Sequence, residues 1–256
     1  MNRMVAITWL LVLMLGASVA RSESTLRVPS PEPGTFSATI YSLEGEAIGE
    51  NLVSSVPQSG GGVVLTSTTL VEGRLEQVME VQLEPIIGTT ELRPVWQRIE
   101  RTIGGGPDRV ALRINHVRRQ AKCERAGKSA EYLPLPQQDR IANVPMTLLL
   151  RPLAAGTVES VDFQMVICER WSRIVGVRVR REGPLVEGAV GMDFRFDIGG
   201  PILSTLFRPF LPRINVWMHP DPPNLWIANR VPLHSGGETV CLVREGIDPA
   251  GFLDGL

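Results

Sequence analysis

The chain has 256 residues, of which 43% are hydrophobic and 21% are charged, and its formal net charge is −1. This length is enough to bury a self-sufficient core, in one large β domain or in two small ones. A nearly neutral chain offers no electrostatic basis for binding nucleic acid or an anionic membrane surface.

The N-terminal stretch 1–20 has the pattern of a secretory signal peptide. Arg3 is followed by an apolar run over 4–15 and then by small residues at Ser18 and Ala20. The run is shorter than the roughly 20 residues that a membrane-spanning helix needs, and Ser18 stands where a lipoprotein signal carries a cysteine. We therefore expect cleavage near Ala20, no lipid anchor, no transmembrane segment after cleavage, and a periplasmic or secreted protein.

Three further regions follow the signal peptide. Residues 21–34 carry Pro29, Pro31 and Pro33 in a polar setting, which predicts a flexible, Pro-rich leader. The folded domain is expected over 35–246. A short tail over 247–256, which contains Gly and Asp, is expected to fray.

Within the domain, apolar and polar residues alternate with a period of two, which is typical of strands with one buried face. Val161, Phe163, Met165 and Ile167 form the clearest such series, within 159–168. The same pattern predicts strands over 109–116, 174–181, 193–198, 213–218, 225–231 and 239–244. Turn sequences separate these runs, including glycine triplets at 60–62 and 104–106, so we expect about ten strands in an antiparallel meander.

One short helix is expected over Val144–Leu150. Asn143 is a candidate N-cap, Pro145 suits the first turn, and Arg151-Pro152 should end the helix. The segment is apolar nearly all round, so it should be buried against the sheet.

Cys123, Cys168 and Cys241 are the three cysteines of the chain. Because their number is odd, at most one disulfide can form within the chain and one thiol is left over. The spacing does not say which pair would be joined, or whether any pair is.

No motif with catalytic or metal-binding chemistry stands out. His116, His219 and His234 do not fall at metal-ligand spacing, and the chain has no Gly-x-Ser-x-Gly elbow. His219-Pro220-Asp221 has the residues of a half site, but its Pro-rich surroundings favour a turn. The glycine triplets lack the Lys-Ser/Thr end of a phosphate-binding loop. We expect no catalytic residues, no metal and no cofactor, and a hydrolase with a site near His219, Asp221 and His234 is a less favoured alternative.

Several segments, taken in order, resemble a known group. The opening strand pair over 36–50, the proline loop and aspartate over 133–139 that lead into the Leu-Arg-Leu helix over 144–156, and the final hairpin from Val216-Trp217 to Trp226-Ile227 are similar to a family of uncharacterised secreted bacterial proteins. That domain-of-unknown-function family is related to the lipoprotein-carrier (LolA-like) β half-barrels.

The resemblance implies a mainly β fold: a single, strongly curved antiparallel sheet, as in a half-barrel or open barrel, with one short helix packed on its concave side. It also implies a non-enzymatic protein that holds an apolar or lipid-like ligand on this side during cell-envelope biogenesis. The candidate ligand-binding residues are Phe163, Met165, Phe194, Phe196, Trp217, Met146 and Leu149. An alternative is that these residues form an ordinary hydrophobic core with no ligand.

An alternative function is a protein-interaction or scaffold module. Exposed edge strands, or the Trp217/Trp226 hairpin, would then dock on a partner protein of the cell envelope.

Overall fold

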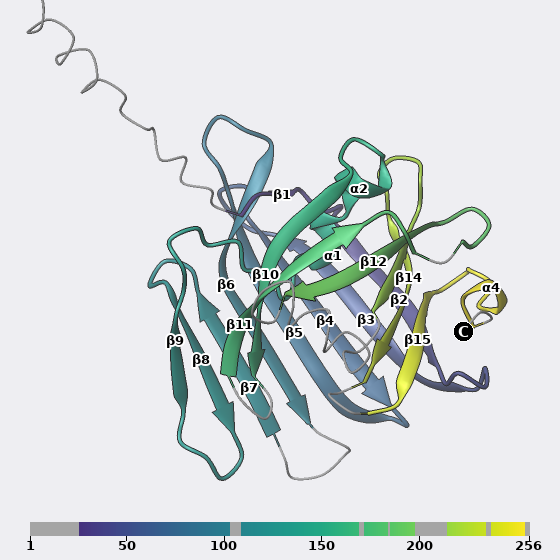
Figure 1. Cartoon of the computed structure of the whole chain (residues 1–256), viewed down its shortest axis with the longest axis horizontal. Coiled ribbons are helices and arrows are strands. Elements are labelled where there is room, and N and C mark those ends of the chain that lie inside the picture. Colours follow the sequence, from purple (N-terminus) through teal and green to yellow (C-terminus); the bar gives the residue numbers. More distant parts are fainter. Residues whose placement is uncertain are drawn as a thin grey trace, which may run out of the picture.

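The computed structural model describes residues 26–102, 109–168, 172–183, 185–197, 214–233 and 237–253. The predicted signal peptide, the second glycine triplet and His234 lie outside these ranges. In the described residues the chain is mainly β, with strands β1 to β15 and three one-turn helices (Figure 1). The strands are β1 (Val28–Pro29), β2 (Gly34–Tyr41), β3 (Ala47–Pro57), β4 (Val63–Val71), β5 (Arg74–Pro85), β6 (Glu91–Thr102), β7 (Arg109–Asn115), β8 (Gln120–Arg125), β9 (Glu131–Pro134), β10 (Ser160–Cys168), β11 (Ser172–Arg180), β12 (Val190–Asp197), β13 (Asn215–Met218), β14 (Trp226–Pro232) and β15 (Thr239–Arg244). The helices are α1 (Met146–Leu149), α2 (Arg151–Ala154) and α4 (Ala250–Leu253).

All of the strands belong to one antiparallel sheet. Its order is β10-β11-β12-β13-β14-β15-β2-β3-β4-β5-β6-β7-β8-β9, with β1 added beside β6. Apart from the pairing of β1 with β6, neighbours in the sheet are neighbours in the chain except where β15 pairs with β2, which joins the end of the fold to its beginning. The predicted single antiparallel sheet is confirmed, and its two ends are the edge strands β9 and β10.

The strands predicted from period-2 alternation are present. β10 buries Phe163 on one face and pairs along its whole length with β11, while β12 to β15 form the expected run of neighbouring strands. The first glycine triplet lies in the turn between β3 and β4, as the hairpin reading predicted, with Gly60 and Gly61 at positive φ. Ile198, at the end of one predicted strand, lies outside the described residues.

The sheet rolls over on itself without closing edge to edge. Figure 1 shows β10 and β11 in front of β7. Val166 and Cys168 of β10 pack against Leu112 and Ile114 of β7 in one buried apolar cluster, and a disulfide joins Cys168 to Cys123 of β8, with Cα atoms 5.6 Å apart. Apolar contacts and one disulfide therefore hold the overlap together, in place of hydrogen bonds between the two edge strands. The third cysteine, Cys241, is free and buried.

The helix expected on the concave side is there, but its ends differ from the prediction. Pro145, not Asn143, stands at the N-cap of α1, and no side chain caps that helix. Arg151-Pro152 does not end the helical stretch, because α2 follows directly with Pro152 in its first turn, where the missing N–H loses no helical hydrogen bond. Leu148, Leu150 and Leu153 fill the space between the two halves of the rolled sheet.

The two ends of the described chain are also more ordered than expected. Leu26 and Val28 are buried, and β1 pairs with β6, so the Pro-rich leader is packed onto the sheet from Leu26 onward. The tail forms α4 instead of fraying, because Phe252 is apolar and packs against the outer face of β13–β15.

Candidate functional site

Six of the seven predicted ligand-binding residues come together on the concave side. Phe163, Phe194 and Leu149 are buried members of the main apolar cluster, and the rings of Phe163 and Phe194 meet edge to face with centroids 6.5 Å apart. Met146, Met165 and Phe196 are partly buried and pack against the same cluster. This group, which we call the concave cluster, lies between β10–β12 and the helices α1 and α2.

The side chains of the concave cluster pack against one another and against the leucines of α1 and α2. Open hollows of about 570 Å³ and about 410 Å³ lie elsewhere on the described part of the chain, and none of the seven predicted residues lines either of them. A ligand at the concave cluster would replace some of these side-chain contacts.

Trp217, the seventh predicted residue, lies on the opposite face of the sheet. It is 1% exposed and belongs to a separate cluster, where Phe252 of α4 packs edge to face on its indole with ring centroids 5.4 Å apart. The register of β13 explains the separation, because neighbouring residues Val216 and Trp217 point to opposite faces. Trp217 therefore neither joins the concave cluster nor offers a surface for docking.

The edge strands also differ from the docking surface that the alternative function requires. The segment before α1 covers part of the free edge of β10: Ala142 N donates to Gln164 O, and the side chain of Asn143 exchanges two hydrogen bonds, of 2.8 and 2.9 Å, with the backbone of Val166. The other edge, β9, is only four residues long and ends in Pro134. Short or covered edges are how folded proteins avoid pairing with another chain.

A buried polar network that the sequence did not indicate holds the segment before α1. Gln97 Nε2 donates to Ile141 O (2.9 Å), and Gln97 Oε1 accepts a hydrogen bond from Val144 N (2.9 Å). The same amide nitrogen lies 2.8 Å from His116 Nε2, while His116 Nδ1 lies 2.7 Å from Asp139 Oδ2. Because the amide nitrogen can only donate, His116 Nε2 accepts, and its proton is on Nδ1, facing Asp139.

A β-bulge explains why the sequence pattern missed Gln97. The register of β5 and β6 shifts by one residue at Val95, so Leu83 faces Pro94 while Gln82 faces Trp96. Beyond the bulge the two faces of β6 are exchanged, which turns Trp96 outward and Gln97 into the core.

The histidines do not assemble a catalytic site in the described residues. The Asp139–His116 pair resembles two members of a triad, but Gln97 occupies the nitrogen that would act as the base. His219 and Asp221 lie in an exposed turn, as the Pro-rich sequence predicted. His219 Nδ1 is 4.0 Å from Asp221 Oδ2 and accepts a hydrogen bond from the backbone N of Asp221. No three His, Cys, Asp or Glu side chains in the described ranges are grouped as metal ligands would be.

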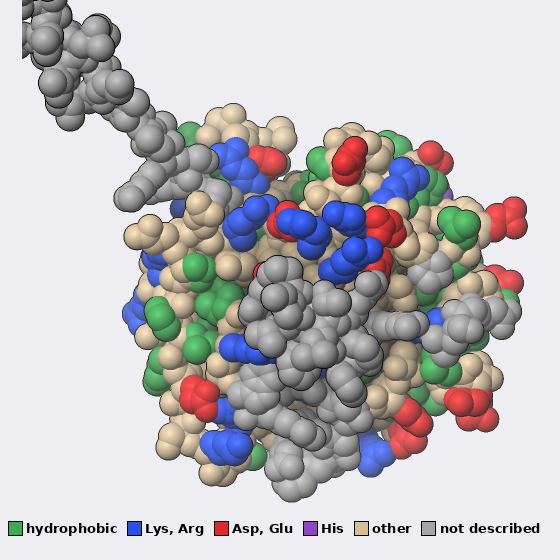
Figure 2. All heavy atoms as spheres, in the orientation of Figure 1, with side chains coloured by type: hydrophobic (Ala, Val, Ile, Leu, Met, Phe, Trp, Pro, Cys, Tyr) green, Lys and Arg blue, Asp and Glu red, His purple; other side chains and the backbone are tan. Residues whose placement is uncertain are grey.

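Charges gather on the outward face of β10–β12. Arg178 pairs with Asp162, and Arg195 pairs with both Glu182 and Asp193. Figure 2 shows basic and acidic side chains side by side in the upper middle of the view. Since these charges are exposed and balanced, they form a solvated face rather than a site for a charged ligand.

Comparisons with known proteins add one structural likeness. No family model matches the chain, and no curated protein matches it. Among solved structures, the chain is similar to a beta-barrel-like protein of domain of unknown function DUF1849 from Brucella abortus, with a TM-score of 0.44 and 11% sequence identity over 88% of this chain and 98% of that one. No helix in the described ranges is both long and apolar enough to cross a membrane.

Proposed function

We propose that this is a non-enzymatic protein of the periplasm or cell exterior that holds an apolar ligand, such as a lipid acyl chain, at the concave cluster. The observation that carries the proposal is the way this cluster is covered. The cover consists of α1 and α2, two single turns without a side-chain cap, which rest on the sheet through leucines. Helices this short have little stability of their own, so their position depends on the apolar contact beneath them.

The partly buried rim of the concave cluster also supports the proposal. Met146, Met165 and Phe196 continue the buried core out to a half-exposed apolar surface. Methionine is unbranched and flexible, so it repacks readily around apolar groups of different shape. An acyl chain would replace contacts that α1 and α2 now make.

Two features support the proposed location. The N-terminal stretch 1–20 has the sequence of a signal peptide. The Cys123–Cys168 disulfide fits an oxidising compartment, where such bonds persist.

The test is native mass spectrometry and lipid extraction of the protein purified from the periplasm of its own host. We expect a bound apolar molecule that organic solvent extracts. Protein that carries no such molecule, and that takes up no fluorescent fatty acid when one is added, would contradict the proposal.

A pair of variants locates the binding. Met165→Gln places an amide at the rim of the concave cluster and should lower the affinity for the fluorescent fatty acid at least tenfold. Leu52→Gln makes a comparable change at a half-exposed position on the other face of the sheet and should leave the affinity unchanged. Equal effects of the two changes would place binding elsewhere.

A further inference from the structure

A row of side chains with hydrogen-bonding capacity crosses the convex face of the sheet. The β-bulge at Val95 brings Trp96 to this face, opposite Gln82 of β5 on one side and Asn115 of β7 on the other. Strands lie about 4.8 Å apart, so Gln82 and Asn115 are separated by about 10 Å, with the indole between them. We call these three residues the carboxamide row.

The two amides of the row are held in fixed orientations. Trp96 Nε1 donates to Gln82 Oε1, and the backbone N of Arg118 donates to Asn115 Oδ1 over 2.7 Å. Since an indole N–H and a backbone N–H can only donate, both carboxamide oxygens are committed, and both NH₂ groups face away from these bonds. Neither NH₂ group has a partner among the described residues, so each can donate to a ligand.

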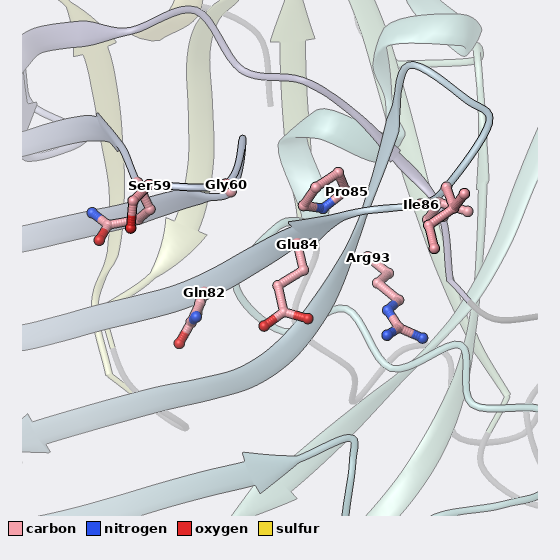
Figure 3. Close-up of a pocket in the computed structure, with 10 residues that line it drawn as sticks. Ser59, Gly60, Gln82, Glu84, Pro85, Ile86 and Arg93 are labelled. Atoms are coloured by element: carbon pink, nitrogen blue, oxygen red, sulfur yellow. The ribbon is translucent and has the colours of Figure 1, made fainter.

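The hollow of about 570 Å³ adjoins the row at Gln82. Figure 3 shows Gln82, Glu84 and Arg93 extending in the same direction from β5 and β6. Glu84 and Arg93 lie opposite each other in the ladder, yet neither forms an ion pair with any described residue. Pro85 and Ile86 form an apolar side of the hollow, and the β3–β4 turn approaches closely there, because a side chain at Gly62 would meet Leu83 O.

We propose that the carboxamide row and the adjoining hollow bind a neutral glycan. The site combines fixed donors in Gln82 and Asn115, an acceptor in Glu84, a further donor in Arg93, and apolar surface from Trp96 and Pro85. Each sugar hydroxyl both donates and accepts, and the C–H face of a sugar packs on an aromatic ring, so a disaccharide matches this mixture over the length of the row.

The same features disfavour other occupants. A simple anion would meet the carboxylate of Glu84, and a simple cation would meet Arg93. An extended peptide would need a free strand edge, but β5 and β6 are both interior strands whose backbone groups are used within the sheet.

The experiment uses saturation-transfer NMR on the full chain with cellobiose, maltose and N,N′-diacetylchitobiose as probes, followed by titration of any disaccharide that responds. Gln82→Glu and Asn115→Asp keep the committed oxygens and replace only the outward NH₂ groups with acceptors. Each change should weaken binding at least tenfold, as expected for the loss of one hydrogen bond that becomes a repulsion. Gln137→Glu makes the same change of charge in an exposed loop and should have no effect.

A second pair of variants removes a cation. Arg93→Ala should weaken binding, whereas Arg74→Ala, at the far end of β5, should not. The proposal is overturned if none of the three disaccharides gives a transfer signal, if Gln137→Glu or Arg74→Ala weakens binding as much as its counterpart, or if the site responds only to diglycine or inorganic phosphate. Because the concave cluster is not involved, fatty-acid binding by these variants is expected to be that of the unmodified protein.

Discussion

Gln97 shows how one polar side chain organises an apolar interior. Its amide makes contacts with the backbone of Ile141, the backbone of Val144 and the imidazole of His116, although the side chain is only 1% exposed. A buried amide is tolerated because each of its donors and acceptors has a partner. The segment that leads into α1 is therefore positioned by hydrogen bonds, while α1 itself is positioned by apolar contact.

Replacing this amide should be costly. Gln97→Leu keeps much of the volume but leaves Ile141 O, Val144 N and His116 Nε2 without a partner, and we expect a loss of about 2–4 kcal/mol in the free energy of unfolding. Urea unfolding measures the loss. Gln120→Leu, at an exposed position on β8, is the control and should change the stability little. Similar losses for the two variants would show that the network contributes nothing.

Glu100 provides a prediction about pH. Burial acts to raise the pKa of Glu100, but hydrogen bonds and charge from Arg98 and Arg109 outweigh it and leave the pKa below the usual value of 4.5. A carboxyl group whose pKa is lower in the folded state contributes stability above its unfolded pKa and loses that contribution as the pH falls through its folded pKa.

The stabilising effect of Glu100 should therefore be complete at neutral pH and disappear in acid. In urea titrations, Glu100→Gln should be less stable than the unmodified protein at pH 7, and the difference should shrink below about pH 4.5. Glu72→Gln, which affects an exposed pair with Arg74, should produce a much smaller difference at pH 7. A difference for Glu100→Gln that stays constant down to pH 2 would contradict the assignment.

At the scale of elements, the success of sequence prediction depended on how regular each strand is. β10 could be predicted because Val161, Phe163 and Met165 alternate with Ser160, Asp162 and Gln164, and no bulge interrupts the strand. In β6, the bulge at Val95 reverses the two faces, so a strict alternation places Trp96 and Gln97 on the wrong sides. Phe163, Met165, Phe194 and Phe196 lie together because their strands alternate regularly. Trp217 was misplaced because Val216, Trp217 and Met218 are all apolar, so the pattern does not indicate which face of their strand points inward.

α4 is the element that the sequence concealed most. Its four residues include Gly251, which is a poor helix former, and nothing in the pattern predicts a helix. Its position comes from tertiary contacts instead: Phe252 packs on Trp217, and Arg230 donates to Phe252 O and Leu253 O at the end of the helix.

Phe252→Ala should therefore cost far more than the length of α4 suggests. Loss of the buried ring removes the cover of Trp217, and we expect the free energy of unfolding to fall by about 3 kcal/mol. Leu253→Ala changes the neighbouring, half-buried residue and should cost clearly less. Guanidinium unfolding of the two variants compares them directly, and equal losses would mean that α4 is not anchored by Phe252.

At the scale of the whole molecule, the fold is a rolled sheet whose ends overlap. Local patterns predicted the antiparallel meander and the short helix buried against it, and the family resemblance implied that the strands form one curved sheet around that helix. The sequence could not predict the overlap of β10 with β7 and β8, nor the choice of Cys123 and Cys168 as the disulfide pair, since these contacts depend on how far the sheet curves.

The disulfide closes a loop of 45 residues across the overlap. Replacing both of its cysteines by serine should lower the free energy of unfolding by up to about 4 kcal/mol, the loop entropy that the cross-link removes from the unfolded chain. Cys241→Ala, which removes a buried thiol but no cross-link, is the control. In the unmodified protein, burial raises the pKa of Cys241 to about 11, so this thiol stays protonated near neutral pH and does not exchange with the Cys123–Cys168 disulfide. A double variant as stable as the control would show that the overlap does not need the cross-link.

The sheet cannot be completed until β15 pairs with β2. Cys241 and Leu242 lie beside Tyr41 and Ile40, about 200 residues earlier in the chain, and β2 has no other partner on that side. A chain that is delivered from its N-terminus, whether from a ribosome or through a membrane pore, must keep β2 half paired until β15 has arrived. Contacts this distant in sequence form slowly. During delivery the waiting edge of β2 is open to other chains, so the hazard for this protein is pairing with a neighbour before its own last strand is available.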